Sequence, residues 1–340
     1  MDRKLWEPLL RFESRDYLER YYREKHARTL NAQRAYEIGS CFTQGREYFA
    51  SAANASDTVK PLLLYYGVAS LGRGFTLLRN ARKKEESLTP GHGLVTVEWP
   101  KTLHTGISSI LELAVQCTKG GFQEFVETAG NGQSHTWLDD QGRLGGFRND
   151  FGEIKFISDG SKVTLGDLLS REPDLVAEYE TIDKGWGNID LGTVVAFDDR
   201  IRVHFMSIKD MNIRQAVESY QFPASATLST QDHPRFPGIQ TLCIEIAATG
   251  EERKKLIPIA GGQENQISWL TRPLANRDQI VDIHRIYIEA FILGMLSRYF
   301  PSKWTGLLRS EKGDVARSVV LATVARIESI FPKLLREQIV

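Results

Sequence analysis

Residues 284–304, HRIYIEAFILGMLSRYFPSKW, limit the folds available to this chain more than any other stretch. From Ile286 to Leu296 every residue is apolar except Glu289 and Gly294. This composition predicts a helix that is buried nearly all round, because its apolar surface leaves no side for water. The run is well short of the roughly 20 residues that a membrane-spanning helix needs. Other elements of the chain must therefore pack around it.

Glu289 and the nearby Arg298 are either parts of a site or polar anchors of a helical core, and the sequence favours anchors. Burying an unpaired carboxylate costs on the order of several kcal/mol, so we expect Glu289 to have a partner. Arg46 and Arg73, from the N-terminal part of the chain, are the candidates, and such a pair would tie the two ends together. The sequence leaves equally open that Glu289 reaches solvent at a helix edge.

Three helices are predicted in the N-terminal part, over residues 14–27 with Ser14 as the N-cap, over 31–55 and over about 59–81. The second and third contain five interior glycines, and each glycine costs up to about 1 kcal/mol relative to alanine. Close packing of two antiparallel helices would offset this cost, and the short connection favours such a hairpin. The glycines concerned are Gly39, Gly45, Gly67, Gly72 and Gly74.

The middle of the chain shows strand patterns after one more predicted helix over residues 101–118. Short strands are expected from residues 121–128 onwards, and residues 192–208 suggest a hairpin. Helices return over 277–300 and 313–338. We therefore predict an α+β fold in which N- and C-terminal helices form a shared bundle with a β-rich middle region. The predicted divisions are a helical region with the hairpin over 1–120, a mixed β-rich region over 121–262, and C-terminal helices packing on the N-terminal bundle over 263–340.

Composition narrows the functional classes. Lys plus Arg and Asp plus Glu are both 43, so no charge excess argues for stable nucleic-acid binding. The three cysteines are isolated, which suits a reducing compartment, and the N-terminus lacks the apolar core of a signal peptide. We expect a cytoplasmic protein. No two of the seven histidines have the spacing of a helical metal site, and neither a metal nor another cofactor is predicted.

Two places offer candidate catalytic histidines. His92 lies between glycines in PGHG, where the backbone can approach another group closely and the ring could act as a base. The more conservative interpretation is a turn histidine that bonds a neighbouring helix end. Arg20 and His26 have the Arg-x4–6-His spacing of helical HEPN-type ribonucleases, in which an arginine holds a phosphate while a histidine moves a proton.

The chain resembles the YaaC-like protein family. The resemblance rests on the order of five segments, covers the chain from about residue 30 to about residue 310, and brings no catalytic residue set. The segments are QGREYFASAA, PLLLYYGVASLGRGF, GHGL, VTLGDLLSREPDL and IEAFILGMLSRYFPSKW. One branch, the JukA-type sensors, belongs to a two-component defence system against nucleus-forming phages and recruits a pore-forming partner.

The resemblance implies a non-enzymatic sensor that recognises a phage component or a phage-derived early vesicle and recruits an effector to the place of infection. A homo-oligomer is compatible with this function. Exposed tryptophans are the binding candidates, because tryptophan is enriched at interaction hot spots. They are Trp137, Trp304 and above all Trp186, in the glycine-rich segment DKGWGNID. A HEPN-like nuclease or other hydrolase is the alternative function, and a housekeeping scaffold is the third.

Overall fold

The computed structural model divides the chain into two compact units. Unit 1 contains residues 1–130, 157–169 and 283–340, and unit 2 contains 131–156 and 170–282. The structure describes residues 3–130, 132–138, 144–150, 157–182, 187–197, 199–205, 220, 222, 225–232, 238, 240–247, 259–264, 267–275, 278–311 and 314–339.

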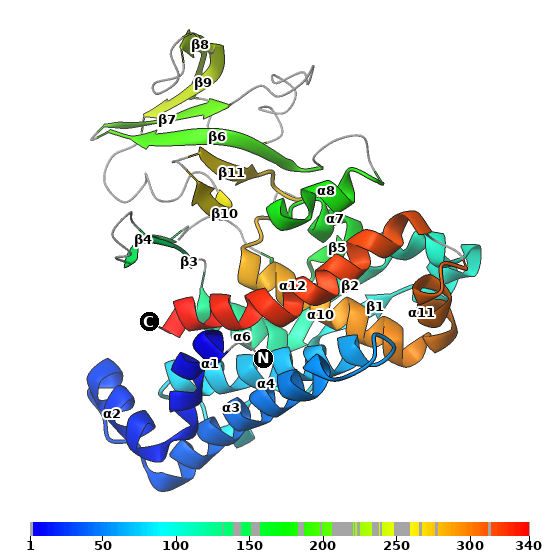
Figure 1. Cartoon of the computed structure of the whole chain (residues 1–340). Coiled ribbons are helices and arrows are strands. Elements are labelled where there is room, and N and C mark those ends of the chain that lie inside the picture. The colour runs from blue at the N-terminus through cyan, green and yellow to red at the C-terminus, as the bar shows by residue number, and fades with distance from the viewer. Residues whose placement is uncertain are drawn as a thin grey trace. The chain divides into compact units, whose positions relative to one another are not determined.

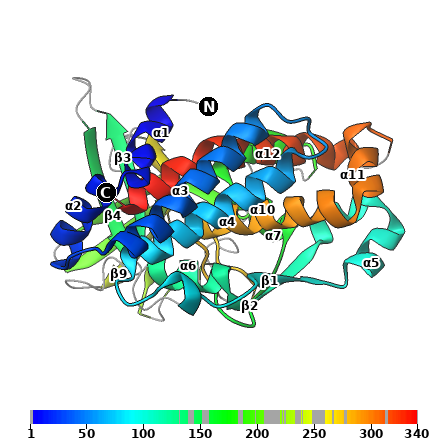
Figure 2. The same ribbon diagram turned by 90° about the horizontal axis from the view of Figure 1, so that it is seen from below.

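Unit 1 is mainly helical, and its helices come from both ends of the chain (Figure 1). The long helices α3, α4, α10 and α12 run alongside one another in both views (Figure 2). Helix α12 packs on α1, α3 and α4, which confirms the predicted shared bundle and the α+β class. The helices are α1 Arg3–Leu10, α2 Arg15–His26, α3 Ala32–Ala53, α4 Lys60–Arg79, α5 Trp99–Thr102, α6 Gly121–Ala129, α7 Leu165–Leu169, α10 Asp282–Tyr299, α11 Pro301–Leu308 and α12 Asp314–Ile339.

Local chemistry explains where the N-terminal helices begin and how they pack. The Ser14 hydroxyl accepts the N–H of Tyr17 at the start of α2, as predicted. In the α3–α4 hairpin, a Cβ on Gly45 would lie 2.5 Å from Leu71 Cγ, and a Cβ on Gly67 would lie 2.6 Å from the Phe49 ring. Two of the predicted helix glycines therefore do bring the helices into contact.

Helix α10 is the apolar helix predicted from residues 284–304, and residues 283–297 are all buried. Its Gly294 faces α4, because a Cβ there would lie 2.7 Å from Tyr65 Cβ. The apolar helix is thus surrounded by protein, as its composition requires.

A small antiparallel sheet in unit 1 corrects two predictions. Its strand order is β1-β2-β5, with β1 His92–Val97, β2 Ala114–Gly120 and β5 Lys162–Thr164. Residues 101–118 are not one helix: Gly106 adopts φ +118°, the following turns are short, and β2 begins at Ala114. Residues 121–128 are not a strand but lie in α6, where buried Phe122, Phe125 and Val126 recur at helical spacing.

Unit 2 contains a six-stranded antiparallel sheet and a separate hairpin of β3 and β4. The order in the large sheet is β10-β11-β6-β7-β9-β8, and β6–β7 form the hairpin predicted over 192–208. Val203, Phe205, Ile244 and Leu270 are buried in its core. The elements are β3 Gly132–Leu138, β4 Leu144–Asp150, α8 Val176–Tyr179, β6 Ile189–Ala196, β7 Arg200–Phe205, β8 Thr227–Asp232, β9 Gln240–Ala247, β10 Ile259–Glu264 and β11 Ile267–Thr271.

Candidate functional site

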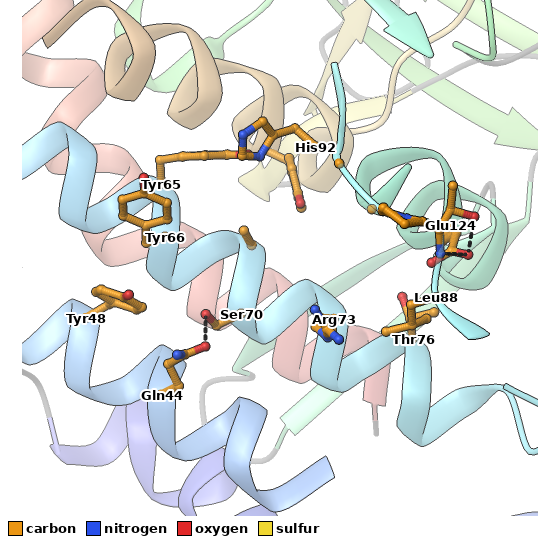
Figure 3. Close-up of a pocket in the computed structure, with 16 residues that line it drawn as sticks. Gln44, Tyr48, Tyr65, Tyr66, Ser70, Arg73, Thr76, Leu88, His92 and Glu124 are labelled. Atoms are coloured by element: carbon orange, nitrogen blue, oxygen red, sulfur yellow. Dashed lines mark hydrogen bonds between the residues drawn. The ribbon is translucent and has the colours of Figure 1, made fainter. Parts of the chain in front are cut away.

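A pocket of about 430 Å³ lies in unit 1, and we call it the hairpin pocket because α3 and α4 form much of its wall. Gln44 and Tyr48 come from α3, and α4 contributes Tyr66 and Ser70 (Figure 3). The volume is within the range of small-molecule sites. The lining residues are Gln44, Tyr48, Tyr65, Tyr66, Ala69, Ser70, Arg73, Thr76, Leu88, Thr89, Pro90, Gly91, His92, Gly121, Glu124 and Tyr287.

Glycines bring the PGHG loop against the start of α6. The N–H of Gly121 donates to the carbonyl of Gly91 at 3.1 Å. Gly93 and Gly120 both have positive φ, +76° and +147°, and a Cβ on Gly120 would lie 2.4 Å from the backbone nitrogen of Gly93. Only glycine allows this backbone-to-backbone approach, which holds His92 in the lining of the pocket.

His92 is bonded to Tyr65, whose hydroxyl lies 2.6 Å from its Nδ1. Burial lowers the pKa of His92, with a further contribution from the positive charge of Arg298, and burial raises the pKa of Tyr65. Both groups are therefore neutral near pH 7, and we assign the Tyr65 hydroxyl as the donor to Nδ1. This leaves the ring proton of His92 on Nε2, where it can be donated to a ligand. Phe291 of α10 packs on both rings.

Further contacts hold two of the tyrosines and two polar side chains of the pocket lining. Arg298 donates to the Tyr66 hydroxyl at 2.6 Å, and the Tyr66 ring lies 5.5 Å from that of Tyr48. The Ser70 hydroxyl donates to Gln44 Oε1 at 2.9 Å (Figure 3). These bonds fix the orientation of the aromatic and polar groups before any ligand binds.

Glu124 supplies the negative charge of the lining, and its side chain is only 7% exposed. Burial alone would raise its pKa, but hydrogen bonds from Lys83 at 2.6 Å and from the N–H and hydroxyl of Thr89 reverse the effect and lower the pKa. Glu124 is therefore ionised, and its bonds attach the residue 88–90 loop to α6. The arrangement as a whole provides aromatic faces and fixed donors, which suits the binding of a polar, ring-containing small molecule.

The structure brings some predicted site residues together in this pocket. His92 and Arg73 line it, and Arg298 is bonded to one of its tyrosines. The sequence analysis did not single out Tyr48, Tyr65 or Tyr66, because aromatic residues at helical spacing are equally typical of a core. In the sequence, only the glycines of α4, beside Tyr65 and Tyr66, indicated that this face of the helix packs closely against another segment.

The partner predicted for Glu289 is wrong. Arg46 pairs with Glu13 at 2.7 Å and also with Glu47, and Arg73 pairs with Glu85 at 3.1 Å. Glu289 is fully buried in α10, and its Oε2 lies 3.6 Å from Nη1 of Arg326 in α12. The ion pair therefore joins two C-terminal helices, because the face of α10 that carries Glu289 faces α12.

The Arg20 and His26 pair does not form a shared site. The Arg20 guanidinium lies over the Tyr17 ring, 5.5 Å from its centroid, whereas His26 Nε2 donates to the carbonyl of Leu78 at 2.9 Å. The bond to a helix-end carbonyl is the role that the sequence analysis considered for a different histidine, His92.

The tryptophan predictions have separate outcomes. Trp304 is not exposed: its ring is fully buried, and its indole N–H donates to the carbonyl of Asp57 at 3.0 Å. Trp186 lies outside the described residues, and for Trp137 only the backbone, in β3, is described. Their predicted binding role stays a prediction.

One buried cysteine–histidine pair in unit 2 deserves comparison with a catalytic pair. Cys243 Sγ lies 3.8 Å from His204 Nε2, but both side chains are buried, and burial raises the pKa of the thiol. A protonated, inaccessible thiol is not a nucleophile. Among the described residues there is no cluster of three or more histidine, cysteine or carboxylate side chains suited to a metal ion.

Fold and site define an α+β protein with a pocket of small-molecule size on a helical hairpin. The chain belongs to the YaaC-like protein family, which it matches over residues 10–339. No curated protein and no solved structure shows a significant match to it. Within the described part of the chain, the helices are too short or too polar to cross a bilayer.

Proposed function

We propose that the protein is a non-enzymatic sensor of phage infection, in which a ligand bound in the hairpin pocket leads to recruitment of an effector partner. The pocket carries the proposal, because its tyrosine rings and donors are oriented by bonds among themselves, and a preformed site of this kind favours recognition. Membership of the YaaC-like family supports the defence role, since that family includes a branch of phage sensors. The effector, a phage component and a second copy of the chain are the proposed partners.

The first test is affinity purification of the tagged protein from cells with and without a nucleus-forming phage, followed by mass spectrometry. A phage component or membrane-active partner recovered only during infection would support the sensor function. Tyr48→Ala should abolish the infection-dependent recovery, whereas Tyr36→Ala should not. Tyr36 lies on the same helix α3, is 72% exposed and does not line the pocket, so it is a matched control.

The alternative function, a nuclease, has a separate test. Metal-independent cleavage of RNA by the purified protein, lost in His26→Ala, would support it. Recovery of RNA fragments in both infected and uninfected cells, without a protein partner, would contradict the sensor function. The same preparation can be used for both measurements, so the two functions are distinguished directly.

A further inference from the structure

A second pocket in unit 1, of about 730 Å³, shares no lining residue with the hairpin pocket, and we call it the basic pocket. It lies where the segment after α2 meets the end of α4. Among the described residues that line it, Glu127 is the only carboxylate. The full lining is Lys25, His26, Arg28, Arg79, Asn80, Ala81, Arg82, Lys83, Glu127 and Thr128.

Basic residues at a helix C-terminus often serve only to neutralise the helix dipole and its free carbonyls. At the end of α4 other groups already perform this task. The Arg34 guanidinium donates to the carbonyls of Leu77 at 2.8 Å, Asn80 at 2.7 Å and Lys83, and His26 donates to that of Leu78. The cations of the basic pocket are therefore additional to those that cap the helix.

Three of the cations have no carboxylate partner among the described residues. Lys83 is bonded to Glu124, and Arg79 lies beside the Tyr21 hydroxyl. Lys25, Arg28 and Arg82 are exposed and form no such pair. Since the chain as a whole has a net charge of zero, this concentration of positive charge in one hollow is a local feature.

We propose that the basic pocket binds a small ligand with two or more linked phosphate groups. Arginine guanidinium groups match phosphate oxygens with paired hydrogen bonds, and the lysine adds a mobile charge. The cations come from two chain segments, 25–28 and 79–83, that line the same hollow, which fits adjacent phosphates better than a single anion. A nucleic-acid strand would instead follow an extended stripe of charge, and an RNA probe tests for that alternative.

The test is calorimetric titration of the full-length protein with inorganic tripolyphosphate, ATP and a ten-nucleotide single-stranded RNA. We expect tripolyphosphate or ATP to bind, and Arg28→Glu/Arg82→Glu to weaken binding by about tenfold or more, because like charges replace two contacts. Lys333→Glu, a single charge reversal and thus half that change, lies at an exposed site of α12 and should leave the affinity within about twofold. Tighter binding of ATP than of tripolyphosphate would identify a nucleotide as the source of the phosphates, and equal binding would identify inorganic phosphate chains.

Three outcomes would overturn the proposal. They are the absence of binding by all three probes, equal affinity in the double variant, and RNA binding that tripolyphosphate does not displace. Both substituted arginines are exposed, and circular dichroism of the variant verifies that it is folded. Tyr48→Ala, in the hairpin pocket, should bind the phosphate probes as the unmodified protein does, so failure of one proposal does not imply failure of the other.

Discussion

The Glu289 carboxylate and the Arg326 guanidinium form a deeply buried ion pair in unit 1, with exposed fractions of 0% and 6%. In such surroundings each charge depends on the other, because neither can be solvated by water. Removing one partner takes this compensation away from the other buried charge.

We therefore expect Glu289→Ala to lower the free energy of unfolding by about 3 kcal/mol or more. Replacing both residues with leucine should restore much of that loss, because the double change removes both charges of the pair. Urea denaturation of the three proteins measures this. A change of less than about 1 kcal/mol in Glu289→Ala would contradict the interpretation of the pair as an anchor.

His284 is fully buried in α10, and neither ring nitrogen has a hydrogen-bond partner among the described residues. The rings of Phe122 and Phe125 face it edge-on. Burial alone lowers its pKa from 6.5 to about 3. Between these values the unfolded chain binds a proton that the folded protein excludes, so stability must fall as the pH decreases through this range.

The expected result is a loss on the order of 1 kcal/mol per pH unit below about pH 6, from this residue alone. His284→Leu should show a shallower decrease between pH 6 and pH 4. The urea midpoint is measured against pH for both proteins, and the difference between the two curves is the result. The difference is needed because carboxylates titrate in both proteins. Parallel profiles would show that His284 does not contribute.

Single residues were predictable from the sequence where the chemistry of the residue type itself limits its surroundings. For Glu289 the sequence analysis left a buried ion pair and solvent exposure equally open, and for the ion pair it named the wrong arginines. The choice depends on which face of α10 meets which helix, and local sequence carries no information on that. For His92, flanking glycines predicted a close backbone approach, which the structure confirms.

At the scale of elements, the packing of α3 on α4 depends on individual glycines. Gly45→Ala places a methyl group 2.5 Å from Leu71 Cγ, whereas Gly39→Ala, on the same helix, meets no atom nearer than 3.6 Å. We expect Gly45→Ala to destabilise the protein by about 1–3 kcal/mol despite the better helix propensity of alanine. Gly39→Ala should be neutral or stabilising by up to about 1 kcal/mol. Thermal unfolding of both variants checks this. Equal shifts in the melting temperature would contradict a special role of Gly45 in the packing of α3 on α4.

The long helices were predictable because their caps and apolar spacing are local. The segment from residue 101 to 128 was not. Its β2 strand is buried on a sheet between β1 and β5, so its apolar residues resemble those of a buried helix. Helix α6 is short and begins directly after Gly120. The spacing of its apolar residues covers too few turns to be distinguished from the pattern of a strand.

At the scale of the whole molecule, two compact units should respond separately to core substitutions. Val203 is fully buried in the unit 2 core, and Val203→Ala should cost about 2 kcal/mol. We expect faster hydrogen exchange in peptides from β6, β7 and β9, with little change in α3, α4 and α10. Gly45→Ala should produce the opposite pattern. Uniform acceleration over both units would show that they unfold as one.

The segments that form unit 1 are synthesised at very different times. About 200 residues separate Arg79, where α4 ends, from Asp282, where α10 begins. At typical rates of synthesis that interval lasts roughly 10 to 40 s. During it the nascent hairpin of α3 and α4 displays the apolar surface that α10 later covers, and the hairpin pocket lacks Tyr287. A chaperone that shields nascent chains would find an exposed apolar surface here, and the lining of the pocket is complete only once the chain has been synthesised through Tyr287.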